Sequence, residues 1–478
     1  MNNKLKPVLL GAVFLVVITN LLTYNWAQQE AADDQHAENF NFFREDEADE
    51  RDEYSLLYEV METLDQEYID DIDREKLLEG AIDGLLGTLD DPQTTFLDAE
   101  DMDEFTEFVV GSFGGVGIRV IDSDEGLTVV DVLPGTPAEN AEMQPGDRVQ
   151  YVEDEDIREM EMERSVELIR GEIGSEVNLQ VQRPGAEDLM DFSLVRQEVS
   201  APTVESDWLD ADAGLGYLEI NQFGGNTGEQ FRNELLDLEG EGLEGLVLDL
   251  RGNPGGILGE ALEVARMLVP EGEIVRIVDR HDEVKDVYHS QAEEKPYPIV
   301  VMIDSHSASG SEIVAGALHE RAGSYLVGEP TFGKATVQEI KRFDGGRGMR
   351  FTASRYETPG GVDLHGEGLT PDYEVEMPPY LQFYYHLIPG ELSQGDYGKT
   401  VEVLQDMLNA LGYDIESQGY FGEETEEALR QFQEDQGVVV DGKFNDITWL
   451  TLQEEMDKVI KDVDTQLQKA LELLEGNK

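Results

Sequence analysis

The chain has 478 residues, 40% of them hydrophobic, a length that predicts several folded domains because single cores rarely grow beyond about 250–300 residues. Its 105 acidic against 34 basic residues give a net charge of −71, which argues against nucleic-acid binding because phosphate would be repelled, and which favours a halophilic habitat where salt screens the self-repulsion. The absence of cysteine excludes disulfides, a thiol nucleophile and cysteine-based metal sites.

Residues 1–29 hold the first predicted element. Lys4 and Lys6 precede or flank the start of the uncharged apolar run PVLLGAVFLVVITNLLTYNW, a pattern typical of a signal peptide or a membrane anchor. No A-x-A cleavage motif follows, so an uncleaved transmembrane helix with its basic end in the cytoplasm is favoured. The protein is therefore expected outside the cytoplasm, membrane-anchored or secreted. Residues 30–53 are polar and strongly acidic and predict a flexible linker.

Residues 54–110 predict an N-terminal helical unit, because apolar side chains recur there at helical spacing. Residues 111–197 change to alternating strands and Gly-rich turns, and their order resembles a PDZ domain, which has a β-sandwich or barrel-like fold. In that family the loop matching GGVGI binds a peptide's C-terminal carboxylate through backbone N–H groups, and the neighbouring strand accepts the peptide as an added strand. The resemblance assigns this loop to Gly115, Val116, Gly117 and Ile118.

Residues 198–385 alternate short apolar strands with helical patterns, which predicts an α/β core with buried strands. Residues 393–455 form a three-helix pattern that resembles the peptidoglycan-binding domain family, through the segments LQDMLNALGY, FGEETEEALRQFQ and DGKFNDITWLTL. Residues 456–478 predict a single amphipathic C-terminal helix. The chain as a whole is thus predicted to be a multidomain α+β protein that ends in a small all-α domain.

The candidate chemistry lies in three blocks of the α/β core: LDLRGNPGG at 248–256, SASGSE at 307–312 and GEPTFGKATVQ at 328–338. A hydroxyl nucleophile needs access, a base and an oxyanion hole. Small residues leave a serine of the second block accessible at the start of a helix, where Ser311 is predicted to be the N-cap. The Gly-Gly turn exposes the backbone N–H of Gly255 or Gly256, and Lys334 lies among uncharged or apolar neighbours, where a lysine can be a base.

Together these blocks resemble the C-terminal processing peptidases, or tail-specific proteases, which join a PDZ domain to a serine protease core of the ClpP or crotonase type. The resemblance covers nearly the whole chain, and the domain order is that of the Bacillus-type members. It implies a Ser/Lys dyad in which Ser309 is the nucleophile, Lys334 is the general base and Gln338 orients the lysine. Gly310 replaces the family's usual alanine and is still expected to donate its N–H to the oxyanion hole.

Other positions depart from the family's pattern or extend the resemblance. Ala335 replaces the glycine that usually follows the lysine, and LDDPQTTF at 89–96 alters a hallmark of the helical unit. Arg170 resembles a PDZ arginine that couples the PDZ domain to the protease. Ser305 and Ser307 are interpreted as packing or turn residues.

The expected function is that of an extracytoplasmic serine endopeptidase that cleaves proteins recognised by their C-terminal tails, in regulated proteolysis at the cell envelope or in sporulation signalling. The expected partners are protein or peptide substrates, peptidoglycan of the cell wall, the membrane, and a second copy of the chain in a homodimer; no cofactor or metal is expected. A lysine base needs its pKa to fall from about 10.4 toward 7 or 8 by desolvation. Because the acidic surface favours the ammonium form, activity is predicted to rise with salt or with alkaline pH.

Two other classes of protein compete with this interpretation. A Ser-His-Asp hydrolase would use His306 or His365 with Asp249 or Asp304, and it would keep substantial turnover after the change Lys334→Ala. A cell-wall scaffold would keep the binding domains beside an inert protease fold, although such a fold has no need of a lysine in apolar surroundings. A metalloprotease is not favoured, because the sequence contains no H-E-x-x-H or comparable spacing.

Overall fold

The computed structural model describes residues 47–123, 126–186, 188–200, 202–378, 380–381 and 391–476. The predicted anchor at 1–29 and the predicted linker up to residue 46 lie outside these ranges. Among the helices that are described, none is both long and apolar enough to cross a membrane. The chain divides into two compact units, Met1–Asp90 and Asp91–Lys478, so the predicted helical unit 54–110 is shared between them.

The described part of the first unit is a pair of helices, α2 (Glu47–Glu67) and α3 (Arg74–Gly87). The side chain of Asp73 caps α3 by accepting hydrogen bonds from the first free backbone N–H groups. The second unit begins with strand β1 (Thr95–Leu97) and helix α4 (Ala99–Val110), which starts at a capping box and ends at a left-handed glycine.

The segment predicted to be a PDZ domain folds around an antiparallel sheet whose strand order is β3-β4-β5-β7-β8. Its strands are β2 (Phe113–Gly115), β3 (Ile118–Ser123), β4 (Gly126–Val132), β5 (Arg148–Val152), β6 (Glu155–Asp156), β7 (Glu176–Gln182), β8 (Met190–Val195) and β9 (Gln197–Val199). Two short helices, α5 (Pro137–Asn140) and α6 (Met162–Ile169), complete it. Strand β3 is an edge strand, so one row of its backbone groups is open to an added strand.

The protease segment is built on a six-stranded sheet in the order β10-β11-β12-β15-β16-β19, parallel except for the first pair. The strands are β10 (Val204–Asp210), β11 (Leu215–Ile220), β12 (Gly245–Asp249), β15 (Ile299–Ile303), β16 (Tyr325–Gly328) and β19 (Tyr373–Glu374). Every residue of β12 and β15 is buried. Both faces of these strands are therefore covered, which explains why GLVLD and IVVMI are largely apolar and do not alternate between polar and apolar residues.

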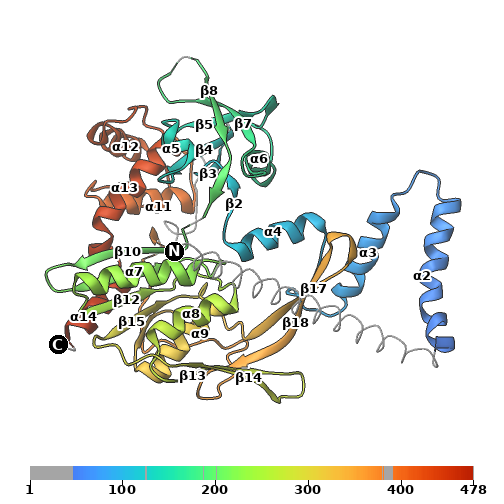
Figure 1. Ribbon diagram of the computed structural model, residues 1–478. Helices are drawn as coiled ribbons and strands as arrows, with labels where there is room; N and C mark the ends of the chain where they lie inside the picture. Colours follow the sequence, from blue (N-terminus) through green and yellow to red (C-terminus); the bar gives the residue numbers. More distant parts are fainter. Residues whose placement is uncertain are drawn as a thin grey trace, which may run out of the picture. The chain divides into compact units, whose positions relative to one another are not determined.

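Helices cover both faces of this sheet (Figure 1). One face packs against α7 (Thr227–Glu241), α8 (Leu258–Leu268) and α9 (Gly310–Ala317), which contribute most of the large hydrophobic core. The other face packs against α14 (Thr465–Gly476) through Leu467, Ala470 and Leu474. A second sheet, built from β1, β18 (Gly348–Glu357), β13 (Gly272–Val278), β14 (Val284–Ser290) and β17 (Thr336–Arg342), flanks the core.

Between the protease strands and α14 the chain forms a separate helical module with its own core. Its helices are α11 (Lys399–Ala410), α12 (Glu423–Gln436) and α13 (Asp446–Val463). The prediction of one helix over residues 456–478 is corrected: α13 ends at Val463, Asp464 is non-helical with ψ of 100°, and α14 starts at Thr465. The module is therefore an insertion in the protease segment, because the chain returns to the sheet after leaving it.

Candidate active site

Ser309 occupies the turn between strand β15 and helix α9. Its φ of +53° is a backbone conformation that non-glycine residues rarely adopt, and such strain is held only where the surroundings impose it. The prediction that Ser311 is the N-cap of α9 is wrong: the helix begins at Gly310, so Ser309 holds the N-cap position, and its N–H donates to Glu312 Oε2 at 2.9 Å. Ser311 is buried inside the first turn, where its hydroxyl donates to the carbonyl of Asn253 at 3.0 Å.

The glycine turn after β12 packs directly against the turn that carries Ser309. A Cβ at Gly255 would lie 2.8 Å from Ser309 Cβ and 2.9 Å from Gly310 N, so only glycine fits this approach. The Gly255 N–H already donates to the side-chain oxygen of Asn253 at 2.8 Å. Within the described ranges no acceptor is bonded to the N–H of Gly256 or of Gly310, so these two amides have a hydrogen bond to offer a ligand.

Packing explains why residue 310, directly after Ser309, is a glycine. An added Cβ at Gly310 would lie 3.0 Å from Phe223 Cδ2 and 3.2 Å from Ala261 Cβ. Phe223 is fully buried, so its ring fills the volume that a methyl group at this position would need.

Lys334 lies on the loop before β17 and lines the same pocket as Ser309. Partial burial lowers the pKa of Lys334, and the Arg350 guanidinium lowers it further, while Asp91 and Glu312 act in the opposite direction. The net shift favours the neutral amine, which is the form that can accept a proton. The direction is thus the one that a lysine base requires.

A pocket of about 380 Å³ contains both side chains. Its polar part holds Ser309 and Lys334, and its apolar wall includes Phe105 and Phe108 of α4 and Ile257 at the start of α8. Helix α4 leads into the PDZ segment at Gly111, so the element that joins the two segments also lines the pocket. An extended peptide that crosses the pocket would place an apolar side chain against this wall.

Gln338 lines the pocket as well, but the described contacts do not join it to Lys334. Its amide donates to the hydroxyl of Thr336 at 3.0 Å. The orienting role predicted for Gln338 would need a different side-chain rotamer from the one in this structure.

Glu312 is a residue of the site that the sequence analysis did not identify. Its carboxylate is 1% exposed and accepts four hydrogen bonds. Oε2 receives the N–H groups of Ser309 and Lys334, both at 2.9 Å, and Oε1 receives the Thr331 hydroxyl at 2.6 Å and the Gly333 N–H at 2.8 Å. One acidic side chain therefore joins the turn that carries Ser309 to the loop that carries Lys334. Its signal in the sequence is a lone acid in the apolar helix SEIVAGAL, where a buried charge needs partners.

The predicted carboxylate-binding loop Gly115, Val116, Gly117 and Ile118 joins β2 to β3. The carbonyls of Val116 and Gly117 accept N–H groups of Ala138 and Leu133 at 2.9 Å, so this loop is fixed to the domain from one side. Arg170, at the end of α6, lies over the ring of Phe113 at 4.1 Å and pairs with Glu107 of α4 at 3.5 Å. Arg170 thus contacts the helix that lines the catalytic pocket.

The histidines of the competing Ser-His-Asp interpretation are placed elsewhere. Neither His306 nor His365 is among the residues that line the Ser309 pocket. The side chain of His306 is 63% exposed and lies 3.6 Å from Asp304. Asp249 is bonded to Arg251 rather than to a histidine. No imidazole therefore lies beside Ser309 among the described residues that line the pocket.

A strained serine beside a glycine turn, with a partly buried lysine in one pocket and a PDZ-like sheet next to it in the chain, defines a serine-type peptidase that carries a PDZ domain. The sequence matches peptidase family S41 over residues 214–375 and the PDZ domain over 114–194. It also matches the activating protease CtpB N-terminal domain over 16–101 and the peptidoglycan binding domain over 397–452.

The chain is 33% identical to the carboxy-terminal processing protease CtpA of Bacillus subtilis over 422 residues, which cover 88% of this chain and 90% of the relative. It is also 33% identical to CtpB of the same organism over 424 residues, 87% of this chain and 88% of that one. A solved structure titled photosystem II D1 C-terminal processing protease aligns with 67% of this chain and 86% of its own, at 31% identity and a TM-score of 0.41. The chain belongs to the carboxy-terminal processing proteases of peptidase family S41.

Proposed function

We propose that this protein is an endopeptidase that works outside the cytoplasm with Ser309 as nucleophile and Lys334 as base. The observation that carries the proposal is the Glu312 carboxylate, which holds the backbones of both residues at the edge of one pocket. A scaffold without activity has no need of this arrangement, because four hydrogen bonds to one buried acid are built around the two residues that a dyad would use.

In the proposed reaction, neutral Lys334 takes the hydroxyl proton of Ser309 while Oγ attacks the scissile carbonyl. The oxyanion accepts hydrogen bonds from the N–H groups of Gly256 and Gly310, and Gly255 adds a third only if it releases Asn253. The ammonium of Lys334 then protonates the leaving amine as the peptide bond breaks, which leaves an acyl-enzyme. Water, deprotonated by the regenerated amine, hydrolyses the ester and restores Ser309.

We propose that the PDZ domain selects substrates by their C-terminal tails. Three observations support this: the open edge of β3, the fixed loop at Gly115 to Ile118, and the names of the two Bacillus subtilis relatives, which describe carboxy-terminal processing. When a tail binds to the PDZ domain, Arg170 would transmit the resulting movement to the catalytic pocket through its ion pair with Glu107 of α4. The contact is exposed and weak by itself, so we assign it a role in coupling rather than in stability.

The remaining proposals concern place and partners. The apolar run of residues 7–26 supports membrane anchoring, and the match of the inserted module to the peptidoglycan binding domain supports attachment at the cell wall. The acid excess supports a salt-rich habitat. A homodimer and a part in envelope proteolysis or sporulation signalling are proposed on the family resemblance alone.

The test is proteolysis of an unfolded protein with an apolar C-terminal tail by the purified protein, compared with Ser309→Ala, Lys334→Ala and His306→Ala. We expect cleavage by the unchanged protein and by His306→Ala, and none by the other two variants. Equal cleavage by the protein and by Ser309→Ala, or substantial cleavage by Lys334→Ala, would refute the dyad. Loss of cleavage when the substrate's tail is amidated or made polar would support selection by the PDZ domain.

A further inference from the structure

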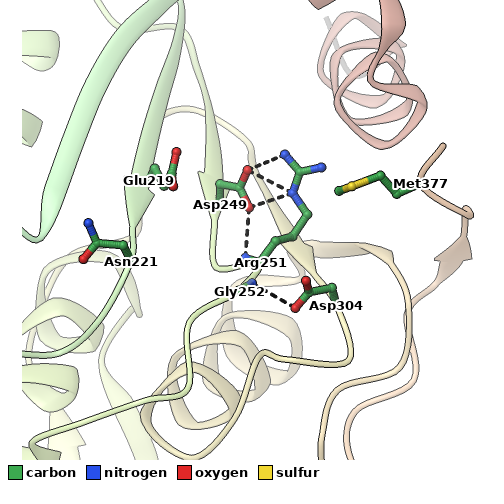
Figure 2. A pocket seen from close by; sticks show the side chains of 7 residues that line it. All are labelled: Glu219, Asn221, Asp249, Arg251, Gly252, Asp304 and Met377. Atoms are coloured by element: carbon green, nitrogen blue, oxygen red, sulfur yellow. Dashed lines mark hydrogen bonds and ion pairs between the residues drawn. The ribbon is translucent and has the colours of Figure 1, made fainter. Parts of the chain in front are cut away.

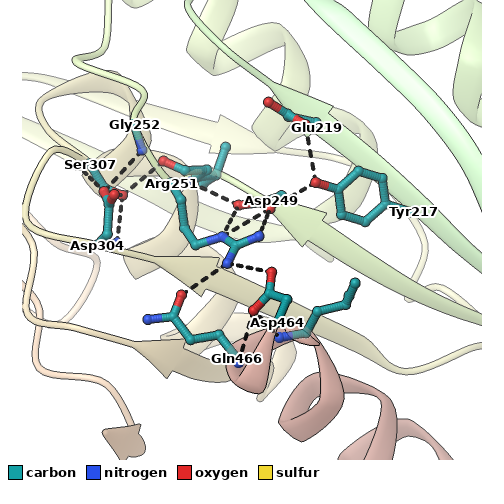
Figure 3. A network of polar contacts seen from close by, with 11 residues as sticks. Tyr217, Glu219, Asp249, Arg251, Gly252, Asp304, Ser307, Asp464 and Gln466 are labelled. Atoms are coloured by element: carbon teal, nitrogen blue, oxygen red, sulfur yellow. Dashed lines mark hydrogen bonds and ion pairs between the residues drawn. The ribbon is translucent and has the colours of Figure 1, made fainter. Parts of the chain in front are cut away.

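Arg251 is a buried cation directly before the glycine turn of the active site. Its side chain is 6% exposed, and its Nε and Nη2 donate to both carboxylate oxygens of Asp249 at 2.5–3.0 Å (Figure 3). The remaining terminal nitrogen, Nη1, points away from the protease strands. It donates to Asp464 Oδ2 at 2.8 Å and to Gln466 Oε1 at 3.0 Å. One guanidinium thus joins the end of β12 to the start of α14.

Asp464 is the residue at which the chain returns from the inserted module to the protease. Its side chain is completely buried, and Oδ1 caps α14 by accepting the N–H groups of Gln466 at 2.9 Å and Leu467 at 3.0 Å. The carboxylate has two separate tasks, because one oxygen holds the helix and the other holds Arg251. An N-cap alone would be served equally well by an exposed asparagine or serine.

The hydrogen bonds continue from Arg251 to the nucleophile turn. The N–H of Gly252 donates to Asp304 Oδ1 at 3.0 Å, and the same oxygen accepts the N–H of Ser307. Asn253 donates its side-chain amide to the carbonyl of Ile220 at 2.7 Å and accepts the N–H of Ala308 on its own carbonyl at 3.0 Å. A displacement of Arg251 would therefore move both the glycine turn and the turn that carries Ser309, because short hydrogen bonds join them.

Carboxylates outnumber cations around this connection. Glu219, Asp249 and Asp304 line a pocket of about 130 Å³ beside Arg251 (Figure 2). Burial, with the neighbouring Asp249 next, raises the pKa of Glu219 to about 7. Arg251 is the cation that Asp249 and Asp464 share, so removing either partner changes where the guanidinium lies.

We propose that Asp464 is a positioning residue for peptide-bond cleavage: through Arg251 it fixes the glycine turn that binds the oxyanion, and it links that turn to the inserted helical module. The inference rests on the function proposed above. It adds that the last turn of the chain before α14 contributes to catalysis without touching the substrate. The module is then more than an appended binding domain, since the residue that ends it also orients the active site.

The test compares Asp464→Asn with Asp462→Asn in the full chain. Asparagine is as good an N-cap as aspartate, so its oxygen keeps α14 capped. Its NH2 group then replaces the oxygen that accepts from Arg251 Nη1, so the charge and the hydrogen bond of residue 464 to Arg251 are both lost. Asp462 is exposed two residues earlier and gives the same change in net charge. We expect Asp464→Asn to lower kcat about tenfold or more with KM changed less than about twofold, because the oxyanion bonds form in the transition state. Asp462→Asn should leave both constants unchanged.

Leu467→Ala serves as the stability control, because Leu467 is buried in the apolar cluster of α14 and the sheet and its side chain is not among the described hydrogen-bond partners of Arg251. It should lower the unfolding temperature without lowering kcat. If Asp464→Asn loses stability as Leu467→Ala does and keeps its kcat, or raises KM alone, Asp464 is only structural and the proposal fails. If Asp464→Asn does not fold, Gln466→Met takes its place, because it removes the other hydrogen bond of Arg251 Nη1. We again expect a lower kcat with little change in KM. Cleavage by Ser309→Ala in the same assay would instead refute the dyad.

Discussion

Replacing Glu312 by glutamine should disable the site while leaving the sheet intact. The Glu312 carboxylate has four lone-pair positions, and each accepts a hydrogen bond. A glutamine side chain has only two such positions, and its NH2 group would face other donors. In the better of the two amide orientations, the NH2 group faces Thr331, whose hydroxyl can rotate, and Gly333, whose N–H is left without an acceptor. The orientation in which it faces Ser309 and Lys334 is worse, because both donors there are backbone N–H groups.

The magnitude follows from these contacts. Hydrogen bonds to a charged group contribute about 1.5–3 kcal/mol each and neutral ones about 0.5–1.5, and an orphaned buried donor costs about 1–3 kcal/mol. Weakening the remaining bonds and orphaning one donor therefore costs about 3–5 kcal/mol locally. The oxygen that accepts from Ser309 and Lys334 loses its negative charge, and the N–H of Gly333, next to Lys334, loses its acceptor. We therefore expect kcat to fall by about 10² or more, which corresponds to about 3 kcal/mol.

The change also predicts a shift in pH dependence. Glu312 raises the pKa of Lys334, so removing its charge lets that pKa fall further. The residual activity of Glu312→Gln should reach its plateau at a lower pH than that of the unchanged protein. Loss of activity and a shift toward acid thus occur together, which general unfolding would not produce.

The assay is a pH series of kcat with hydrogen exchange of the segments around residues 305–313 and 330–336. Both segments should lose protection in Glu312→Gln, while β12 and β15 keep theirs. Glu339→Gln is the matched control, because Glu339 is exposed on β17 and pairs only with Lys285. Activity and protection within twofold of the unchanged protein would refute the reasoning, and so would a plateau that moves toward alkaline pH.

Three further outcomes follow from the site. Lys334→Met should abolish turnover yet raise the unfolding temperature in differential scanning fluorimetry, because burial lowers the pKa of Lys334 and the charged form is a cost to the fold; a lower temperature would contradict this. Activity should rise with pH to a plateau whose midpoint lies below the 10.5 of a free lysine, and stability should also rise with pH between the two values, since the unfolded chain binds more protons there. Gly255→Ala should lower kcat about 10²-fold, because its Cβ would lie 2.8 Å from Ser309 Cβ, whereas Gly259→Ala, with its nearest neighbour at 3.9 Å, should be harmless.

The candidate dyad was easier to recognise in the sequence than the residues that support it. Ser309 and Lys334 lie in short blocks of small or uncharged residues, so their neighbourhood is readable from the residue types alone. The position of the helix start was not, because the +53° φ of Ser309 depends on the packing of the glycine turn and on the buried carboxylate that accepts its N–H. Serine is a good N-cap at either 309 or 311, and local preference cannot choose between them.

Long-range contacts account for the other differences. The run from Asp446 to Gly476 is amphipathic throughout, so periodicity predicts a continuous helix over its end. At the break, Asp464 bonds to Arg251, which lies more than two hundred positions earlier in the chain, and α14 turns to cover the sheet. No sequence pattern within residues 446–476 indicates that Arg251 and the sheet are their partners. The orienting role of Gln338 depends on a rotamer in the same way, which a motif does not specify.

The place of α14 in the chain has a consequence for biosynthesis. Strands β12, β15 and β16 bury one face against Leu467, Ala470 and Leu474, yet these side chains are synthesised after the entire inserted module. Until then that face of the sheet is uncovered and Arg251 lacks its second carboxylate. A nascent chain therefore contains Ser309 and Lys334 before it contains α14 and the Asp464 partner of Arg251. If Asp464 positions the glycine turn as proposed, the order of synthesis keeps the active site incomplete until α14 has been made.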